Sequence, residues 1–248
     1  MKLLTSTWFE VQHYLKSSDG IIVPTGSVEQ HGPIGLIGTD ALCVEEIAGE
    51  VGRNINALIA PTLAYAPAEF NMEFPGTISI SSELFQELCR QVLSSLARQG
   101  FRHIYLLNGH GANLEPLRNL KNSITDVEIR IRSWWDFESV NELRDKYFGD
   151  WEGMHATPSE ISITRVNHRE IQSSLAKMPP KKLSKKYIID HSGDKHGDAK
   201  EHRKNFPDGR VGSHSALAKE EFGIELMNQA VSQLSLIHIS EPTRQASI

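Results

Sequence analysis

The sequence predicts an α/β domain built around a mainly parallel β-sheet, and three observations support this fold class. Short apolar runs typical of buried strands occur at 21–24, 57–61 and 103–107. Segments with helical periodicity lie between them, at 41–54 and 82–99. Strands that alternate with helices at this spacing indicate parallel pairing, with the helices packed on the sheet.

Each element has its own signal along the chain. In the clearest helix, Leu84, Leu88, Val92 and Leu96 recur every four residues, and Gly100 ends the pattern. The expected elements are, in order, a helix at 6–15, a strand at 21–24, a helix at 41–54, a strand at 57–61, a long loop at 62–76, a helix at 82–99, a strand at 103–107, a helix from about 114, a strand at 127–132, a helix ending at 165 and a closing helix at 215–231.

The composition excludes several classes of protein. With 26 basic and 31 acidic residues, the formal charge of −5 argues against non-specific nucleic-acid binding. No apolar run approaches the roughly 18 residues that a membrane span requires, and the N-terminus has too short an apolar core for a secretory signal. Cys43 and Cys89 each lie in a helical pattern, so we expect no disulfide framework and a cytosolic protein.

A glycine-rich loop after the first strand carries the most informative side chains. It contains Glu29 and His31, and Asp40 follows it at the head of the next helix. His110 comes directly after the strand at 103–107. Ligands in α/β proteins bind beyond the carboxyl ends of the strands, and carboxylate and imidazole groups there are typical metal ligands. The alternative is a solvated turn in which Asp40 only caps a helix.

The segment 178–205 is polar and basic, and we expect a surface excursion there. It contains His191, His196 and His202, which we expect to be solvated loop histidines rather than ligands.

Four segments in order resemble the signatures of the creatininase (creatinine amidohydrolase) family. The resemblance covers roughly residues 5 to 232. The segments are Gly26-Ser27-Val28-Glu29-Gln30-His31-Gly32-Pro33 with Gly38-Thr39-Asp40, then Phe74-Pro75-Gly76-Thr77-Ile78-Ser79, then Asn108-Gly109-His110-Gly111-Ala112-Asn113, and His155 to Glu160.

The resemblance implies a three-layer α/β/α fold with a mainly parallel central sheet, two divalent metal ions per chain and a homo-hexamer. Carried over by position, Glu29, Asp40 and His110 would hold one ion. His31 and Glu160 would hold the other, with Asp40 bridging the two. These ligand types suit zinc, manganese or iron.

Three positions depart from the creatininase pattern. Ala112 stands where creatininase has a second-metal glutamate, as in the branch where Glu160 takes that role. Met154 stands where creatininase has a catalytic glutamate, and Thr157 replaces a glycine. These differences argue against creatinine as the substrate and leave the metal site intact.

Because the catalytic glutamate is missing, another group must give the leaving nitrogen its proton. Glu152 and His155 are the nearest titratable candidates, although Glu152 could also be a solvated loop carboxylate. We expect Trp151 and Met154 to line the substrate pocket, and the alternative for Trp151 is a place in the core.

We therefore expect a metal-dependent hydrolase that cleaves a non-peptide C–N bond, in an amide, cyclic amide or formamide, of a small-molecule substrate. Two ions about 3.5–4 Å apart can share a bridging hydroxide and polarise a carbonyl, and no serine or cysteine lies in a nucleophile motif. The alternatives are a hydrolase of a C–C or peptide bond, and a metal-binding but catalytically idle oligomeric protein, which Met154 suggests.

The segment 234–248 is expected to be a non-native tail. From Leu234 to Arg244 it matches, codon by codon, a translation of the adapter DNA used in transposon-based sequencing libraries. We expect residues 1–233 to form a single hydrolase domain, and His238 and Glu241 to have no catalytic role. The alternative is a genuine C-terminal extension.

Overall fold

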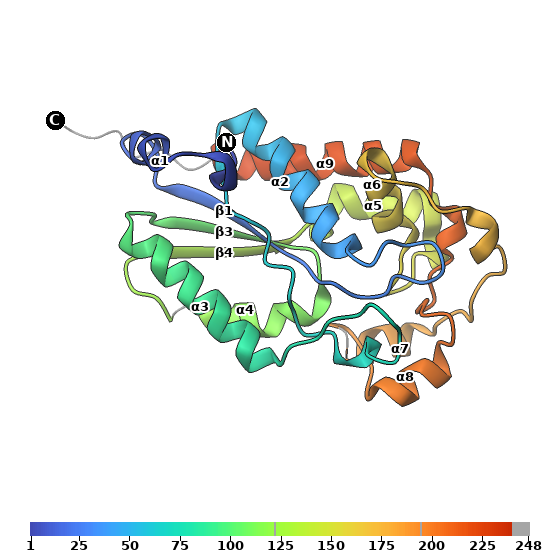
Figure 1. The fold of residues 1–248 in the computed structure, drawn as a ribbon. Coiled ribbons are helices and arrows are strands. Elements are labelled where there is room, and N and C mark those ends of the chain that lie inside the picture. The colour runs from blue at the N-terminus through green and yellow to red at the C-terminus, as the bar shows by residue number, and fades with distance from the viewer. Residues whose placement is uncertain (122, 194, 240–248) are drawn as a thin grey trace.

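A four-stranded parallel sheet lies at the centre of the computed structural model, which describes residues 1–121, 123–193 and 195–239 (Figure 1). The strands lie in the order β2-β1-β3-β4, and all three neighbouring pairs are parallel. This confirms the mainly parallel sheet predicted from the alternating pattern. The strands are β1 (Gly20–Thr25), β2 (Leu58–Ile59), β3 (His103–Asn108) and β4 (Glu128–Ser133).

Helices cover both faces of the sheet, which confirms the three-layer arrangement (Figure 1). Successive strand residues point to opposite faces, so Ile22 packs with one helical layer while Ile21 and Val23 pack with the other. The first layer contains α2 (Thr39–Ile55), α5 (Glu138–Phe148), α6 (Pro158–Asn167) and α9 (Glu220–Ile239). The second contains α1 (Trp8–Tyr14), α3 (Ser82–Arg98) and α4 (Leu114–Leu120).

The helix α3 is confirmed, but its buried face was predicted one residue out of register. Phe85, Cys89 and Leu93 are buried, whereas Leu84 is 56% exposed. A row of every fourth residue drifts around a helix of 3.6 residues per turn, so two adjacent rows fit one sequence almost equally well. The row that contains the large Phe85 ring is the one that meets the sheet.

The helix α5 was not predicted from the sequence. Val140 and Phe148 are buried, and Leu143 and Tyr147 pack against the same apolar cluster, so the helix has an apolar face at helical spacing. This face packs against α9 and α6.

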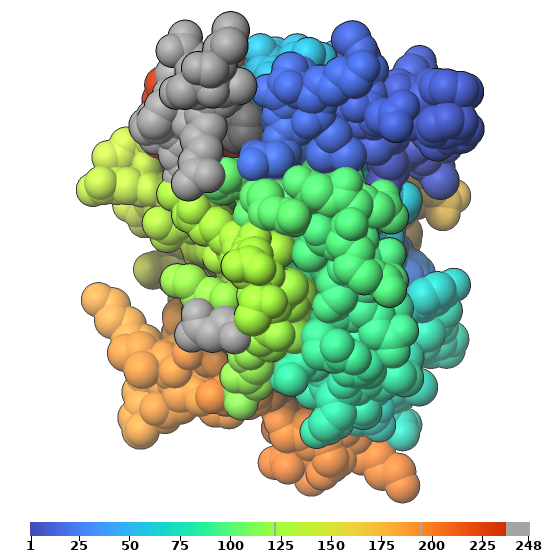
Figure 2. Space-filling view, turned by 90° about the vertical axis from the view of Figure 1, so that its left-hand side faces the viewer, coloured from blue at the N-terminus to red at the C-terminus, as the bar shows by residue number. Residues whose placement is uncertain are grey.

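The excursion after residue 177 contains two short helices, α7 (Lys185–Asp190) and α8 (Ala199–Asn205). They lie beyond the carboxyl ends of the strands, where α8 packs against a short 3₁₀ helix, η2 (Glu69–Asn71), within the loop at 62–76 (Figure 1). In Figure 2 this excursion occupies the end of the molecule opposite the N-terminal residues.

The closing helix α9 is longer than predicted. It runs to Ile239 rather than ending near 231, because Leu234 is buried in the same apolar cluster as Leu226 and Ala230. Apolar residues at these positions continue the buried stripe past 231. The part of the expected tail at 240–248, including Glu241, lies outside the described residues.

No helix in the described part of the chain is long and apolar enough to cross a membrane. Both cysteines, Cys43 and Cys89, are buried and free.

Candidate metal centre

The site forms where two neighbouring strands end beside the start of α2. β1 and β3 are paired through Thr25 and Asn108, so the loops that follow them begin side by side. The next residue of the first loop is Gly26, and a Cβ there would lie 2.4 Å from Ala41 Cα. A Cβ on Gly109 would lie 2.4 Å from the Asp40 carbonyl oxygen. The two glycines therefore let both loops touch the first turn of α2, which carries Asp40.

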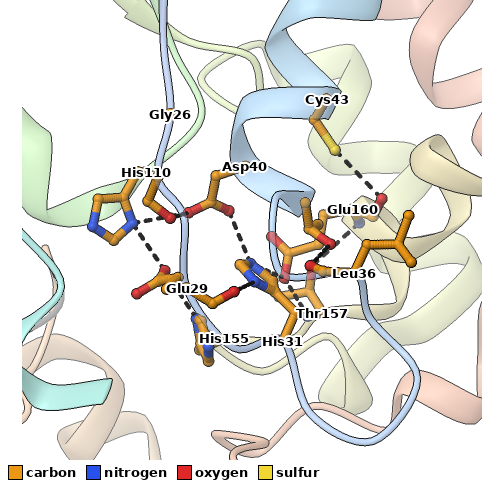
Figure 3. Close-up of polar contacts among 12 residues, drawn as sticks. Gly26, Glu29, His31, Leu36, Asp40, Cys43, His110, His155, Thr157 and Glu160 are labelled. Atoms are coloured by element: carbon orange, nitrogen blue, oxygen red, sulfur yellow. Dashed lines mark hydrogen bonds and ion pairs between the residues drawn. The ribbon is translucent and has the colours of Figure 1, made fainter. Parts of the chain in front are cut away.

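Asp40 lies between two histidines and offers one oxygen to each (Figure 3). Its Oδ1 is 2.9 Å from His31 Nε2, and its Oδ2 is 2.9 Å from His110 Nδ1. The Ser27 hydroxyl donates to Oδ2 at 2.8 Å and fixes the carboxylate plane. The two oxygens of this buried carboxylate are thus directed to opposite sides, one toward each imidazole.

Two further carboxylates flank the histidines on either side of Asp40 (Figure 3). Glu29 Oε1 is 3.1 Å from His110 Nδ1, and Glu160 Oε1 is 3.7 Å from His31 Nε2. Glu160 is held by the start of α6, where its carboxylate accepts a 2.5 Å hydrogen bond from the Thr157 N–H in a capping box. The ligand atoms of Glu29, Asp40 and His110 lie within 4.8 Å of one another, as do those of His31, Asp40 and Glu160.

Backbone carbonyls determine which nitrogen of each histidine faces the carboxylates. His31 Nδ1 is 3.1 Å from the Glu29 carbonyl oxygen, and His110 Nε2 is 2.6 Å from the Pro67 carbonyl oxygen. A carbonyl only accepts, so these nitrogens carry the ring protons. His31 Nε2 and His110 Nδ1 therefore face the cluster, and their lone pairs become available to a cation once these nitrogens lose their protons.

The cluster is buried and concentrates charge, which shifts the pKa of its members. Burial alone lowers the pKa of His31, but the Asp40 and Glu160 carboxylates outweigh burial and raise it to about 10. Burial raises the pKa of Glu160 to about 8, against the effect of His31. For Asp40, burial acts upward, but the two histidines hold its pKa well below the usual range. The metal-free cluster therefore holds protons where cations would otherwise bind.

His155 lies beside the cluster, and its tautomer follows from hydrogen-bond accounting. Its Nε2 is 2.7 Å from the Gln30 carbonyl oxygen and 3.0 Å from the Gln30 side-chain Nε2. The two protons of that amide nitrogen donate to Asn71 Oδ1 and to the Gly209 carbonyl, so His155 Nε2 is itself the donor to the Gln30 carbonyl. His155 Nδ1 faces Glu29 Oε1 at 3.7 Å.

Glu152 is buried next to the cluster but is engaged by other groups. Its Oε1 accepts from Arg144 Nε at 3.0 Å and from the Ser159 hydroxyl. The expected pocket residues lie nearby on the same loop. The half-buried Trp151 ring contacts His214 and has the Lys182 ammonium 4.7 Å from its centre. Met154 is half-buried and donates its N–H to the Val211 carbonyl.

The prediction that the excursion histidines are solvated is wrong for two of them. His202 is fully buried and His196 is 7% exposed, while His191 is half-buried. His196 and His202 pack with their ring centres 4.9 and 5.1 Å from that of Phe70, because α8 lies against η2. A polar sequence without apolar periodicity gave no sign of this burial.

Sequence reasoning also missed two buried amides, Gln30 and Asn71. Gln30 lies between two expected ligands, Glu29 and His31. In an extended chain its side chain would point to the side opposite theirs, so it was not expected at the site. Asn71 lies in a loop expected to be irregular, yet its Nδ2 donates to Glu29 Oε2 at 2.9 Å. Its position four residues before the Pro75-Gly76 turn was the only available signal.

Comparison with known proteins links this geometry to one family. The model of the family described as "Creatininase: Creatinine amidohydrolase" matches residues 5–237. The creatinine amidohydrolase of Pseudomonas putida is 28% identical over 176 residues, which cover 63% of this chain and 68% of that protein. The 3-dehydro-scyllo-inosose hydrolase of Thermotoga maritima is 33% identical over 71% of this chain, but the match spans only 55% of its length. The mycofactocin precursor peptide peptidase of Mycobacterium ulcerans is 32% identical over 66% of this chain and 65% of its own.

Solved structures agree on the fold. A manganese form of creatininase has a TM-score of 0.76 at 22% identity, covering 97% of this chain and 98% of that one. A zinc–zinc form of a creatininase variant has a TM-score of 0.74, with the same identity and coverage. At this identity the likeness establishes the fold alone.

Proposed function

The chain belongs to the creatininase family of amidohydrolases, and from this premise we propose that it is a metal-dependent hydrolase of a non-peptide C–N bond in a small molecule. One observation carries the proposal, which is the division of the Asp40 oxygens between His31 and His110, each at 2.9 Å. A solvated turn with a helix cap would not bury a carboxylate between two imidazoles whose other nitrogens are tied to carbonyls.

The donor atoms fit two divalent cations. Glu29, Asp40 and His110 would hold one ion, and His31, Asp40 and Glu160 would hold the other. Glu29 Oε1 is buried and lies 3.1 Å from His110 Nδ1, a pair of donors that suits a cation beside them. Zinc and manganese match the donors, and both metals occur in creatininase structures with this fold. When bound, the ions would polarise the scissile carbonyl and lower the pKa of the attacking water.

His155 is the residue best placed to move the proton to the leaving nitrogen. Its Nε2–H is used by the Gln30 carbonyl, while Nδ1 is turned toward Glu29 at 3.7 Å. Glu152 is the weaker candidate, because Arg144 and Ser159 already occupy its Oε1. Proton transfer by a positioned side chain requires hydrogen-bond reach to the reacting group, and His155 faces the cluster. Trp151 and Met154, on the same loop, would wall the substrate pocket.

A second candidate function is hydrolysis of a peptide or C–C bond. Relatives of similar identity include a mycofactocin precursor peptide peptidase and a 3-dehydro-scyllo-inosose hydrolase, so substrates differ among the relatives. Met154, in place of the glutamate of creatininase, favours a substrate other than creatinine. We also propose a homo-hexameric assembly and a cytosolic location, both of which remain predictions.

An activity screen with a metal control tests the proposal. Protein loaded with manganese or zinc would be incubated with simple amides, cyclic amides, formamides and short peptides, and the products identified by NMR. We expect turnover of at least one non-peptide amide, which is lost on chelation and restored by metal. Turnover of peptides alone would favour the second candidate, and full metal content without any turnover would favour a catalytically idle metal protein.

A further inference from the structure

We propose that Asn71 is a positioning residue. Its hydrogen bond to one Glu29 oxygen leaves only the other oxygen for a metal ion, and it thereby determines how tightly the protein binds one of the two ions. The inference rests on the proposed dinuclear site and adds to it a residue of the loop at 62–76. Asn71 is fully buried, and its side chain contacts the same carboxylate that contacts His110.

The orientation of the Asn71 amide follows from its neighbours. Gln30 Oε1 accepts the Gly32 N–H at 2.7 Å, so the other end of the Gln30 amide, Nε2, must point toward Asn71. Gln30 Nε2 donates to Asn71 Oδ1 at 2.8 Å. This leaves Asn71 Nδ2 to donate to Glu29 Oε2 at 2.9 Å. The hydrogen bond thus runs from a neutral buried amide to a metal-ligand carboxylate.

This hydrogen bond gives the two Glu29 oxygens different partners. Oε2 is tied to Asn71, and Oε1 remains beside His110 Nδ1 at 3.1 Å. Without the amide, Oε2 would be a buried and unpaired carboxylate oxygen, which is costly. The carboxylate would then turn, and Oε1 would leave the position from which it faces the cluster.

The loop that carries Asn71 supports only one side of the cluster. It supplies the Pro67 carbonyl to His110 and the Asn71 amide to Glu29, the two ligands that are not shared with the second ion. By contrast, His31 is oriented by the Glu29 carbonyl, and Glu160 by the Thr157 N–H. The loop is itself fixed through η2, where Phe70 packs against the rings of His196 and His202. Loss of the Asn71 side chain should therefore weaken the binding of one ion and leave the binding of the other unchanged.

The test is a metal-retention titration of the full chain. Wild-type protein and Asn71→Leu, which keeps the branching at Cγ but is apolar, would be loaded with Mn²⁺, dialysed against graded chelator and analysed for metal. We expect one ion of Asn71→Leu to be lost at about 10–100-fold higher free Mn²⁺ than in wild type, with the other unchanged. Glu29→Gln, which alters the ligand itself, should lose the same single ion.

A matched control separates this effect from general loss of stability. Tyr14→Phe removes another buried hydrogen bond, from the Tyr14 hydroxyl to the Gly20 carbonyl at 2.8 Å, at the start of β1. It should lower Tm and leave both affinities unchanged. If Asn71→Leu does not fold, Asn71→Ala removes the same two hydrogen bonds without added bulk.

Three results would overturn the inference. Wild-type affinity for both ions in the Asn71 variants would show that the amide does not position Glu29. Parallel loss of both ions would show general loosening rather than a role at one ligand. Fewer than two ions in wild type would overturn the dinuclear site itself. This result is seen in the unmutated protein, whereas the first two results are seen only in the variants.

Discussion

His31 lies between two carboxylates, and this placement makes metal binding depend on pH. In the metal-free protein, Asp40 and Glu160 overcome burial and raise the pKa of His31 to about 10, while burial raises the pKa of Glu160 to about 8. Both groups hold a proton at pH 7, and a metal ion requires both to be deprotonated. Metal uptake at pH 7 should therefore release protons, and the affinity should rise from pH 6 to 8.

The same shifts predict the pH dependence of stability without metal. Each pKa is higher in the folded than in the unfolded chain, so the stability from these groups is complete below the unfolded pKa. It is lost as pH rises through about 8 for Glu160 and about 10 for His31. The Tm of the metal-free protein should fall between pH 6 and 9, and added metal should reverse the fall. Thermal melts with and without metal measure this dependence.

Titration calorimetry of metal binding, in two buffers of different ionisation enthalpy, measures the number of protons released when the metal binds. Metal binding without proton release would contradict the protonation of His31 and Glu160 in the metal-free protein.

His155 and Glu152 make different predictions as proton donors. His155→Gln should lower kcat by about 10²–10⁴-fold with both ions retained, because the imidazole faces the cluster without being one of the five proposed ligands. Glu152→Gln should cost less than about tenfold, since Arg144 and Ser159 hold its Oε1 and, unlike His155, it forms no hydrogen bond or ion pair with the proposed ligands among the described residues. Steady-state kinetics with parallel metal analysis measures both variants. A larger loss of kcat in Glu152→Gln than in His155→Gln would identify Glu152 as the proton donor. Loss of metal from His155→Gln would show that His155 is a metal ligand.

At the scale of elements, the sequence predicted those whose signal is local. Strands β1, β2 and β3 appear where apolar runs predict them, because a parallel sheet buries its strands, whereas the edge strand β4 carries charged residues between its apolar ones. The burial of His202 was missed because its partner Phe70 is far away in the sequence. The helix α5 was missed although Val140, Leu143 and Tyr147 recur at helical spacing, because charged residues separate them. The two loops that carry Glu29, His31 and His110 were singled out because glycines and polar residues follow strand ends, and the structure brings these side chains together. Asn71 was missed because its contact with Glu29 forms only once the loop at 62–76 folds against the loop that follows β1.

The end of α9 gives a prediction about the segment 234–248, which we propose to be non-native. Truncation after residue 233 should leave both ions and the activity in place, because the proposed ligands lie before it. It should also remove the buried Leu234, worth at most about 1.5–3 kcal/mol, and lower Tm by roughly 3–12 °C. The paired variants Leu234→Ala and Leu236→Ala, the second at a position 56% exposed, separate packing from length in thermal melts. Loss of metal or activity on truncation would contradict a non-native tail, as would the same tail in independently cloned genomic DNA.

At the scale of the whole molecule, the resemblance to creatininase predicts a homo-hexamer. Multi-angle light scattering at micromolar concentration should give about six times the chain mass of 27.8 kDa. The truncated chain is a useful control, because an added tail could alter assembly without touching the site. A mass close to that of one chain would refute the hexamer, and it would leave the proposed metal centre untouched because every proposed ligand comes from one chain.

The most direct test of the account is the number of metal ions per chain. Plasma mass spectrometry of manganese-loaded and dialysed protein should find close to two ions in wild type. Asp40→Ala should lose both, because Asp40 faces His31 and His110 at 2.9 Å each. Asp19→Ala, at a carboxylate with a side chain 44% exposed, should keep both. Tight retention of two ions by Asp40→Ala would contradict the bridging carboxylate on which the proposed function depends.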